Sequence, residues 1–333
     1  MRYARFENLG ENEIVAYPIV NKNGSLLVKE GVAVNDMIIE KLKKLGYHGI
    51  CIHDNKFDDV IYEPVIPMEL KIRAVQSVEH KDVDACLDLS SSIASELMDS
   101  GGYVCNALED LNNYDAATSA HSVSVATNAG TLGILLGYDY KRVRQVIITS
   151  LLHDIGKSKI DKDILNKPGA LNDAEYEEIK KHSSLGYEML KDNPTIDSVV
   201  RVSVLQHHEN YDGSGYPSGL SGSDIYEYAR IIRICDVYDA LVSKRCYKER
   251  SNPTDVLAYI NCNLGKIFDP HIAKIFLRAI APYPVGSAVL LSNTERAIVV
   301  KNNSEHPTEP VVRTLNGREI DTFYDEEYIV AFA

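Results

Sequence analysis

Five of the ten histidines in this chain lie between residues 121 and 208. They are His121, His153, His182, His207 and His208, with Asp154 beside the second of them and Asp236 farther along the chain. Each lies within or at the end of a stretch with helical periodicity, and the helices of a bundle can direct such side chains to one point. Imidazole and carboxylate groups bind divalent transition metals. We therefore expect a metal site at the centre of a helical bundle.

Asp154 strengthens this expectation. It is needed as evidence because a single histidine on a helix is more often a surface residue or a hydrogen-bonded core residue than a metal ligand. The aspartate follows the apolar run of residues 147–152 and precedes Ile155, Gly156 and Lys157. Burying a charged carboxylate after such a run costs several kcal/mol unless it is paired or bound to metal. Lys157, three residues later, is close enough to contact a phosphate held on the metals. The histidines outside the cluster are interpreted as structural: His48, His53, His80, His271 and His306.

The composition limits the classes of partner. The formal net charge is -13, whereas binding a nucleic-acid polymer needs a dense basic surface. A small phosphorylated ligand is compatible with this negative net charge, because metals and a few cations act at short range while the distant acidic surface is screened. No stretch approaches 18 apolar residues, and the N-terminus lacks the apolar run of a signal peptide. The six cysteines lack CxxC spacing. We expect a cytoplasmic protein with reduced thiols and no membrane span.

Four segments differ in pattern, and together they predict a multidomain α+β protein with an all-α bundle as its catalytic core. Residues 1–62 indicate a small α/β domain, with a hairpin turn at Asn23-Gly24 and a helix capped by Asn35. Residues 63–113 indicate a helical linker or signalling stalk, which could support a homodimer. Residues 114–282 carry the helices of the bundle, at 118–136, 142–153, 172–190, 199–208, 229–241, 253–264 and 270–281. Residues 283–333 contain short β-rich runs typical of a small antiparallel barrel or sheet.

Five motifs follow one another between residues 113 and 282: LLHDIGKSKIDKDILNKPGALN, KKHSSLGYEML, HHENYDGSGYP, ARIIRICDVYDALVSKRCYK and IFDP. In their order and spacing they resemble the HD-GYP phosphodiesterases, a subgroup of the HD metallohydrolase superfamily. The resemblance covers about half of the chain. It implies an all-helical bundle that binds two or three metals and hydrolyses cyclic di-GMP.

Carried over by position, the resemblance implies seven metal ligands: His121, His153, Asp154, His182, His207, His208 and Asp236. Asp154 would bridge two metals, with His121, His153 and Asp236 at one and the remaining three histidines at the other. Seven ligands supply about eight bonds to a pair of six-coordinate ions, which leaves about four positions for water, hydroxide and phosphate oxygens. A hydroxide bridging the metals would be the nucleophile. The donors suit iron, with manganese, zinc or nickel as alternatives.

The same resemblance implies the groups that bind the substrate. Lys157, Arg245 and Lys248 would contact phosphate, although the last two also fit a solvated run of charges. Residues 212–217, here called the GYP loop, would shape the pocket beside His207 and His208 and end in Gly215, Tyr216 and Pro217. Tyr216 would either contact the substrate or brace the loop. A signalling partner could bind at the GYP loop or at the flanking domains.

Two positions depart from the family pattern. Members with a third metal carry a glutamate where this chain has Ala117, so we expect two metals per chain. Cys246 stands where proline is common.

The predicted reaction is hydrolysis of cyclic di-GMP to linear pGpG, with slower hydrolysis of pGpG to GMP as a possible second step. One alternative is a phosphohydrolase for another nucleotide, such as cyclic GMP-AMP, and another is a degenerate protein that senses a nucleotide or binds a partner. The complete ligand set and Lys157 favour an enzyme.

Overall fold

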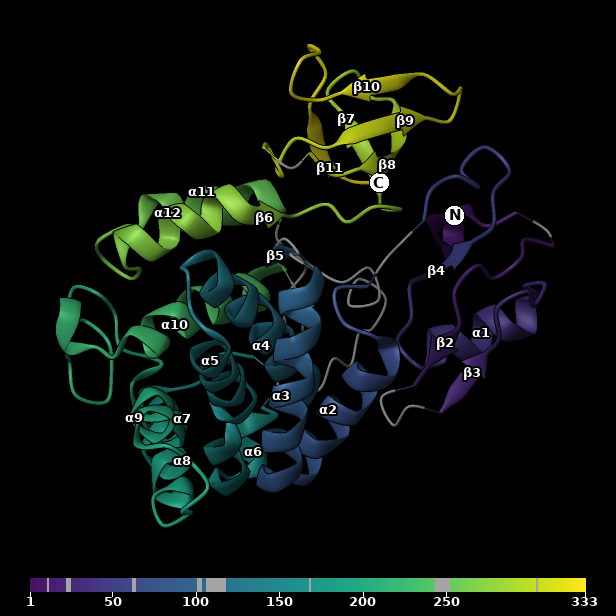
Figure 1. Cartoon of the computed structure of the whole chain (residues 1–333). Coiled ribbons are helices and arrows are strands. Elements are labelled where there is room, and N and C mark those ends of the chain that lie inside the picture. Colours follow the sequence, from purple (N-terminus) through teal and green to yellow (C-terminus); the bar gives the residue numbers. More distant parts are fainter. Residues whose placement is uncertain are drawn as a thin grey trace.

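The computed structural model describes residues 1–10, 12–21, 25–61, 64–100, 104–105, 118–167, 169–242, 252–303 and 305–333. A helical bundle occupies the centre, with a small α/β unit at the N-terminal end and a β-sheet at the C-terminal end (Figure 1). This is the multidomain α+β class that the sequence predicts. Among the described helices, none combines the length and the apolar character needed to cross a membrane.

The bundle is built around one hydrophobic cluster that draws residues from most of its helices. Its principal helices are α4 (Thr118–Leu135), α5 (Tyr140–Leu152), α9 (Ser198–Gln206) and α10 (Glu227–Val242). The bundle also contains η3 (Ile155–Lys159), α6 (Lys162–Leu165), α7 (Asp173–Lys180), α8 (His182–Leu190), η4 (Gly222–Asp224), α11 (Pro253–Cys262) and α12 (Pro270–Ala279). The capping box is confirmed, because Asn172 accepts from the backbone N–H of Glu175 and the Glu175 carboxylate accepts from that of Asn172.

The helix predicted over residues 172–190 is interrupted, and the prediction of one continuous helix is wrong. The chain forms α7 and α8, separated at Lys181. The His182 ring lies 2.7 Å from the carbonyl oxygen of Ile179, which in a continuous helix would accept from the N–H of Ser183. The break places His182 at the first position of α8.

The segment predicted as a linker or stalk also differs from expectation. It forms two helices, α2 (Met68–His80) and α3 (Val83–Ser100), which meet at Lys81. Buried residues of both, such as Leu70, Ala74, Ile93 and Leu97, belong to the same hydrophobic cluster as α4 and α5. Figure 1 shows the two helices alongside the bundle. Their apolar faces are therefore covered within the chain and do not form a free-standing stalk.

The flanking units are small sheets with their own apolar clusters. At the N-terminal end, β1 (Arg2–Arg5) pairs with β4 (Gly49–Ile52), and β2 (Ile19–Val20) pairs with β3 (Leu26–Val28). Asn35 caps α1 (Asp36–Lys44) as predicted, by accepting from the N–H of Ile38. The short helix η1 (Phe6–Asn8) and strand β1 have no counterpart in the predicted elements. The hairpin turn predicted at Asn23-Gly24 lies outside the described residues.

The C-terminal sheet is antiparallel, with the strand order β10-β9-β8-β7-β11. Its strands are β7 (Ala288–Leu291), β8 (Arg296–Lys301), β9 (Val311–Thr314), β10 (Glu319–Asp321) and β11 (Ile329–Phe332). The sequence predicts β-rich runs at 288–291, 297–300, 311–313 and 328–332, which match four of these strands, whereas β10 was not predicted. The short strands β5 (Val104–Cys105) and β6 (Ile280–Ala281) pair in parallel, so α12 ends two residues earlier than predicted.

The two flanking units contact each other although they lie at opposite ends of the sequence. The backbone N–H of Tyr3 donates to the carbonyl of Gly286 at 2.8 Å. The Arg313 guanidinium forms two contacts of 2.7 Å with the Asp59 carboxylate. Phe57 and Val60 pack against Ile298 of β8. The two units thus share an interface beside the bundle.

We predict that Gly156→Ala disrupts the packing of η3 on α8. A Cβ at this position would lie 2.0 Å from the carbonyl oxygen of His182 and 2.5 Å from the backbone nitrogen of Gly186. Since backbone atoms cannot move aside like a side chain, we expect a loss of about 3 kcal/mol in the free energy of unfolding, measured in urea. Gly186→Ala is the matched control, because its Cβ would meet the Val204 side chain at 3.1 Å and should cost less. Equal stability of Gly156→Ala and the unmodified protein would contradict the prediction.

Candidate metal centre

The structure gathers the predicted ligands at the centre of the bundle. His121 lies on α4, and His153 and Asp154 lie between α5 and η3. His182 begins α8, His207 and His208 follow α9, and Asp236 lies on α10. Ligand atoms of Asp154, His182, His207 and His208 lie within 4.8 Å of one another, and so do those of His121, His153 and Asp154. Asp154 therefore belongs to both groups.

Three of the imidazoles are oriented by the same backbone contact. His153, His182 and His207 each donate from Nδ1 to the carbonyl three residues earlier, at Ser150 (2.6 Å), Ile179 (2.7 Å) and Val204 (2.6 Å). Each ring stands at a helix terminus or break, where carbonyl groups lack helical partners. A proton on Nδ1 leaves the Nε2 lone pair free to bind a metal.

Burial keeps the imidazoles of one group neutral. It lowers the pKa of His182, and lowers those of His207 and His208 well below the usual value. At His207 the neighbouring imidazoles lower the pKa further. A neutral imidazole is the form that binds metal. This group is therefore in its ligand form without any change of protonation at neutral pH.

Asp154 lies between the imidazoles and is almost fully buried. Its Oδ2 accepts from Lys157 Nζ at 2.6 Å and lies 3.3 Å from His153 Nε2, while its Oδ1 lies 3.5 Å from His182 Nε2. Burial alone would raise the pKa of this carboxyl, but electrostatic interactions with His153 and Lys157 hold the pKa well below the usual range. The carboxylate is therefore ionised.

Two buried atoms at this point lack a hydrogen-bond partner in the described part of the chain: Asp154 Oδ1 and His153 Nε2. Leaving such atoms unsatisfied costs about 1–3 kcal/mol each, and more where the group is charged. Both are ligand atoms of a kind that divalent metals accept. The His/Asp cluster therefore fits a divalent metal site.

His121 is held between two carboxylates of α10. Its Nε2 lies 3.0 Å from Asp236 Oδ1, and its Nδ1 lies 2.5 Å from Asp239 Oδ2. Burial alone would lower the pKa of His121, but Asp239 and Asp236 raise it to about 9. No role was predicted for Asp239. Its spacing of three residues from Asp236 puts both carboxylates on one face of a helix, and that spacing is the signal that could have identified it.

The GYP loop packs directly on the backbone that follows the two adjacent histidines. A Cβ on Gly215 would lie 2.2 Å from the backbone nitrogen of Asn210, so only glycine fits there. The Tyr216 ring stacks on His208, with ring centroids 4.7 Å apart and an interplanar angle of 25°. The buried Glu209 carboxylate accepts from the backbone N–H groups of Ser218 (2.7 Å) and Leu220 (3.1 Å). Glu209, which the sequence analysis did not assign, thus anchors the end of the loop.

One further cation reaches this face of the cluster. Arg233 donates from Nε and Nη2 to Asn210 Oδ1, at 3.1 and 2.9 Å, and its Nη1 lies 3.4 Å from His208 Nδ1. This arginine was also not predicted from sequence. Arg245 and Lys248, with Ala117 and Cys246, lie outside the described residues, and the roles predicted for these positions stay predictions.

We predict that Asp239→Ala weakens metal binding, because His121 would lose the acceptor that orients its ring. Loss of such a supporting contact typically lowers metal affinity by about 10- to 100-fold. Titration against a competing chelator measures the change. Asp239→Asn keeps an acceptor oxygen and should lose less, and the exposed Asp224→Ala is the control. Unchanged affinity in Asp239→Ala would rule out this role.

Comparison with known proteins agrees with the geometry. Residues 106–272, half of the chain, match the HD domain family. A cyclic di-GMP phosphodiesterase of Pseudomonas aeruginosa is 35% identical over 207 residues, which are 62% of this chain and 50% of that protein. A 3'3'-cGAMP-specific phosphodiesterase of Vibrio cholerae is 35% identical over 161 residues, which are 48% of this chain and 31% of that protein. The chain thus spans half or less of the length of these two relatives.

A solved HDG"Y"P protein from Bdellovibrio bacteriovorus has the same fold over 82% of this chain and 97% of its own, with a TM-score of 0.54 and 20% sequence identity. The matched segment contains the seven clustered histidines and aspartates, and it ends within α12, ten residues before the end of the predicted catalytic segment. The family match leads to one conclusion: this chain belongs to the HD domain family.

Proposed function

We propose that the protein is a metal-dependent phosphodiesterase that hydrolyses cyclic di-GMP to linear pGpG, with slower cutting to GMP. The observation that carries this proposal is the buried Asp154 carboxylate, which two groups of imidazoles share and on which the Lys157 ammonium rests. The relative from Pseudomonas aeruginosa is named for this activity, which supports the same substrate class.

The donor set supports two divalent cations, one for each group that contains Asp154. Iron suits the imidazole-rich set best, and manganese, zinc and nickel are the alternatives. Asp236 would complete the group of His121 and His153, since its Oδ1 lies 3.0 Å from His121 Nε2. When bound, such cations act as Lewis acids and lower the pKa of water, so that a nucleophile is available near neutral pH. Two dications against two aspartates leave a positive site that suits a phosphodiester.

The residues of the chain itself would bind and orient the substrate. Lys157 is partly exposed and can offer its ammonium group to a phosphate oxygen while it remains beside Asp154. There it would stabilise the negative charge that develops on the phosphate in the transition state. Tyr216 would form a wall of the pocket through its stack on His208, and Arg233 would add positive charge on that side. Arg245 and Lys248 are proposed as further phosphate contacts.

A cyclic GMP-AMP phosphodiesterase is the second candidate, because the relative from Vibrio cholerae is named for that substrate. A nucleotide sensor without catalysis is less well supported, since six of the seven predicted ligands form two groups that share Asp154 and the seventh, Asp236, lies beside His121.

We also propose that the protein is cytoplasmic and that it binds a signalling partner or a second copy of the chain. Cys86, Cys235 and Cys262 form no disulfide within the described part of the chain, which fits a reducing cytoplasm. The exposed surfaces of the GYP loop and of the joined flanking units could bind a signalling partner or a second copy of the chain.

The substrate is tested with purified protein that has been reconstituted with metal under reducing conditions. Cyclic di-GMP, 3'3'-cGAMP and bis(p-nitrophenyl) phosphate are compared by chromatography of the products. We expect cyclic di-GMP to be converted to pGpG with the highest kcat/KM of the three. Turnover of the simple diester without turnover of cyclic di-GMP would make the substrate assignment wrong. Binding of cyclic di-GMP without turnover of any diester would favour the sensor.

Substitutions at Asp154 and at Lys157 should have different effects on metal binding and catalysis. Asp154→Ala should lose both metal and activity, because its carboxylate serves both groups of ligands. Lys157→Ala should keep its metal and lose about 100-fold in kcat, the usual effect of removing one group that stabilises transition-state charge. Elemental analysis measures the metal, with two ions per chain expected in the unmodified protein. Lys159→Ala, an exposed lysine in the same turn, is the control. Metal loss in Lys157→Ala would contradict this division.

A further inference from the structure

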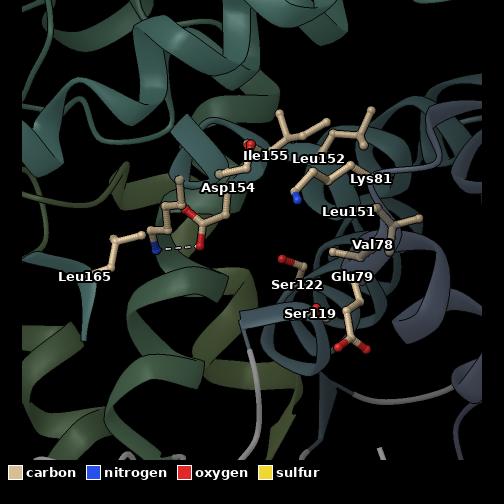
Figure 2. Close-up of a pocket in the computed structure, with 12 residues that line it drawn as sticks. Val78, Glu79, Lys81, Ser119, Ser122, Leu151, Leu152, Asp154, Ile155 and Leu165 are labelled. Carbon is tan, nitrogen blue, oxygen red and sulfur yellow. Dashed lines mark hydrogen bonds and ion pairs between the residues drawn. The ribbon is translucent and has the colours of Figure 1, made fainter. Parts of the chain in front are cut away.

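A cavity of about 210 Å³ opens beside the metal centre, on the side of Asp154 and Lys157 (Figure 2). Its wall combines the end of α2, the first turns of α4, the end of α5, and η3 with α6. It is smaller than the ~300–1,000 Å³ of typical ligand pockets, so it can hold part of a cyclic dinucleotide and not the whole molecule. Of the seven predicted ligands, Asp154 lines this cavity.

Lys81 brings a second ammonium group to this cavity. In Figure 2 its side chain points toward the middle of the cavity, across from Asp154. Within the described parts of the chain, the Lys81 ammonium forms no hydrogen bond or ion pair, whereas Lys157 is held by Asp154. Lys81 is thus an exposed cation without an ion pair among the described residues, and it lines the same cavity as Asp154 and Glu79.

The backbone at Lys81 gives no reason for a lysine. The residue ends α2 in the left-handed conformation, with φ 59° and ψ 34°, and its N–H caps the helix by donating to carbonyls of the last turn. Glycine is the usual residue at such a position because a side chain there is strained. A strained residue other than glycine beside a site points to a use for its side chain.

We propose that Lys81 binds the second phosphodiester of the cyclic dinucleotide while the first lies over Asp154 and Lys157. This inference rests on the proposed function and makes Lys81 a specificity-determining residue. The two phosphodiesters of such a substrate belong to one ring, so when one is at the metal centre the other lies about one ribose away. A lysine offers a compact charge that binds phosphate without requiring a fixed geometry.

The corner between α2 and α3, which contains Lys81, would contribute to substrate binding. Lys81 lies before residues 106–272, the segment that matches the HD domain family. Helices α2 and α3 pack into the core of the bundle, which holds the corner at the edge of the cavity. The corner would thus distinguish a cyclic dinucleotide, which has two phosphodiesters, from a simple diester, which has one.

Lys81→Gly tests the proposal, because glycine adopts the left-handed conformation readily and should preserve the fold. We expect KM for cyclic di-GMP to rise about tenfold, as for the loss of one hydrogen bond to a charged group. The affinity of metal-free protein for cyclic di-GMP, measured by calorimetry, should fall by the same factor. The kcat/KM for bis(p-nitrophenyl) phosphate should not change. Thr294→Gly is the matched control, since Thr294 has φ 70° in the turn between β7 and β8, outside the bundle.

Two outcomes would overturn the proposal. Unchanged KM and affinity for cyclic di-GMP would show that Lys81 does not bind the substrate. Equal losses with cyclic di-GMP and with the simple diester would show that Lys81 acts on the metal centre and not on a second phosphate. Failure of the proposed function gives a different result, because the unmodified protein would then leave cyclic di-GMP intact. If the unmodified protein binds cyclic di-GMP without hydrolysing it, the affinity of Lys81→Gly still tests the role of Lys81. If the unmodified protein does not bind cyclic di-GMP, both proposals are wrong.

Discussion

The centre of this protein depends on keeping one ionised carboxylate, that of Asp154, away from water. Removing a charge from water costs several kcal/mol unless other charges and hydrogen bonds replace the lost hydration. Lys157 replaces part of it at one oxygen, whereas the other oxygen faces His182 without a hydrogen bond from the described residues. A divalent cation is the group that would complete this environment. The neighbouring helices have to end, break or approach closely around the carboxylate.

The ends of helices supply most of the donors. His153, His182 and His207 use the same contact, from Nδ1 to a carbonyl three residues earlier, at three different helix ends. The contact satisfies a carbonyl that the helix leaves free and sets the orientation of the ring. The close approach of Gly156 to the backbone of α8 then places the first of these rings near the second. Local backbone geometry thus prepares a site that spans several helices.

Segments outside residues 106–272 pack against the matched domain or against each other. Helices α2 and α3 share the core of the bundle, and their corner lines the cavity at Asp154. The flanking units contact each other through Tyr3, Arg313 and the apolar residues around Phe57. A change at that interface can therefore reach the bundle through α2, through the β5–β6 pair, and through Asn252 at the start of α11, which donates to the carbonyl of Val330 in β11.

Local patterns in the sequence determined the helices of the bundle, the caps at Asn35 and Asn172, the family, and the seven residues that could meet at a metal. These features follow from neighbours in the chain or from motifs of a few residues. The break at Lys181, the packing of α2 and α3, and the contacts of Asp239, Glu209 and Arg233 were decided by tertiary structure. Each depends on a partner that is distant in sequence or on a competition for one carbonyl, and residue periodicity contains no information about either. Which side of Asp154 is open, and that Lys81 faces it, likewise follows only from how the helices pack.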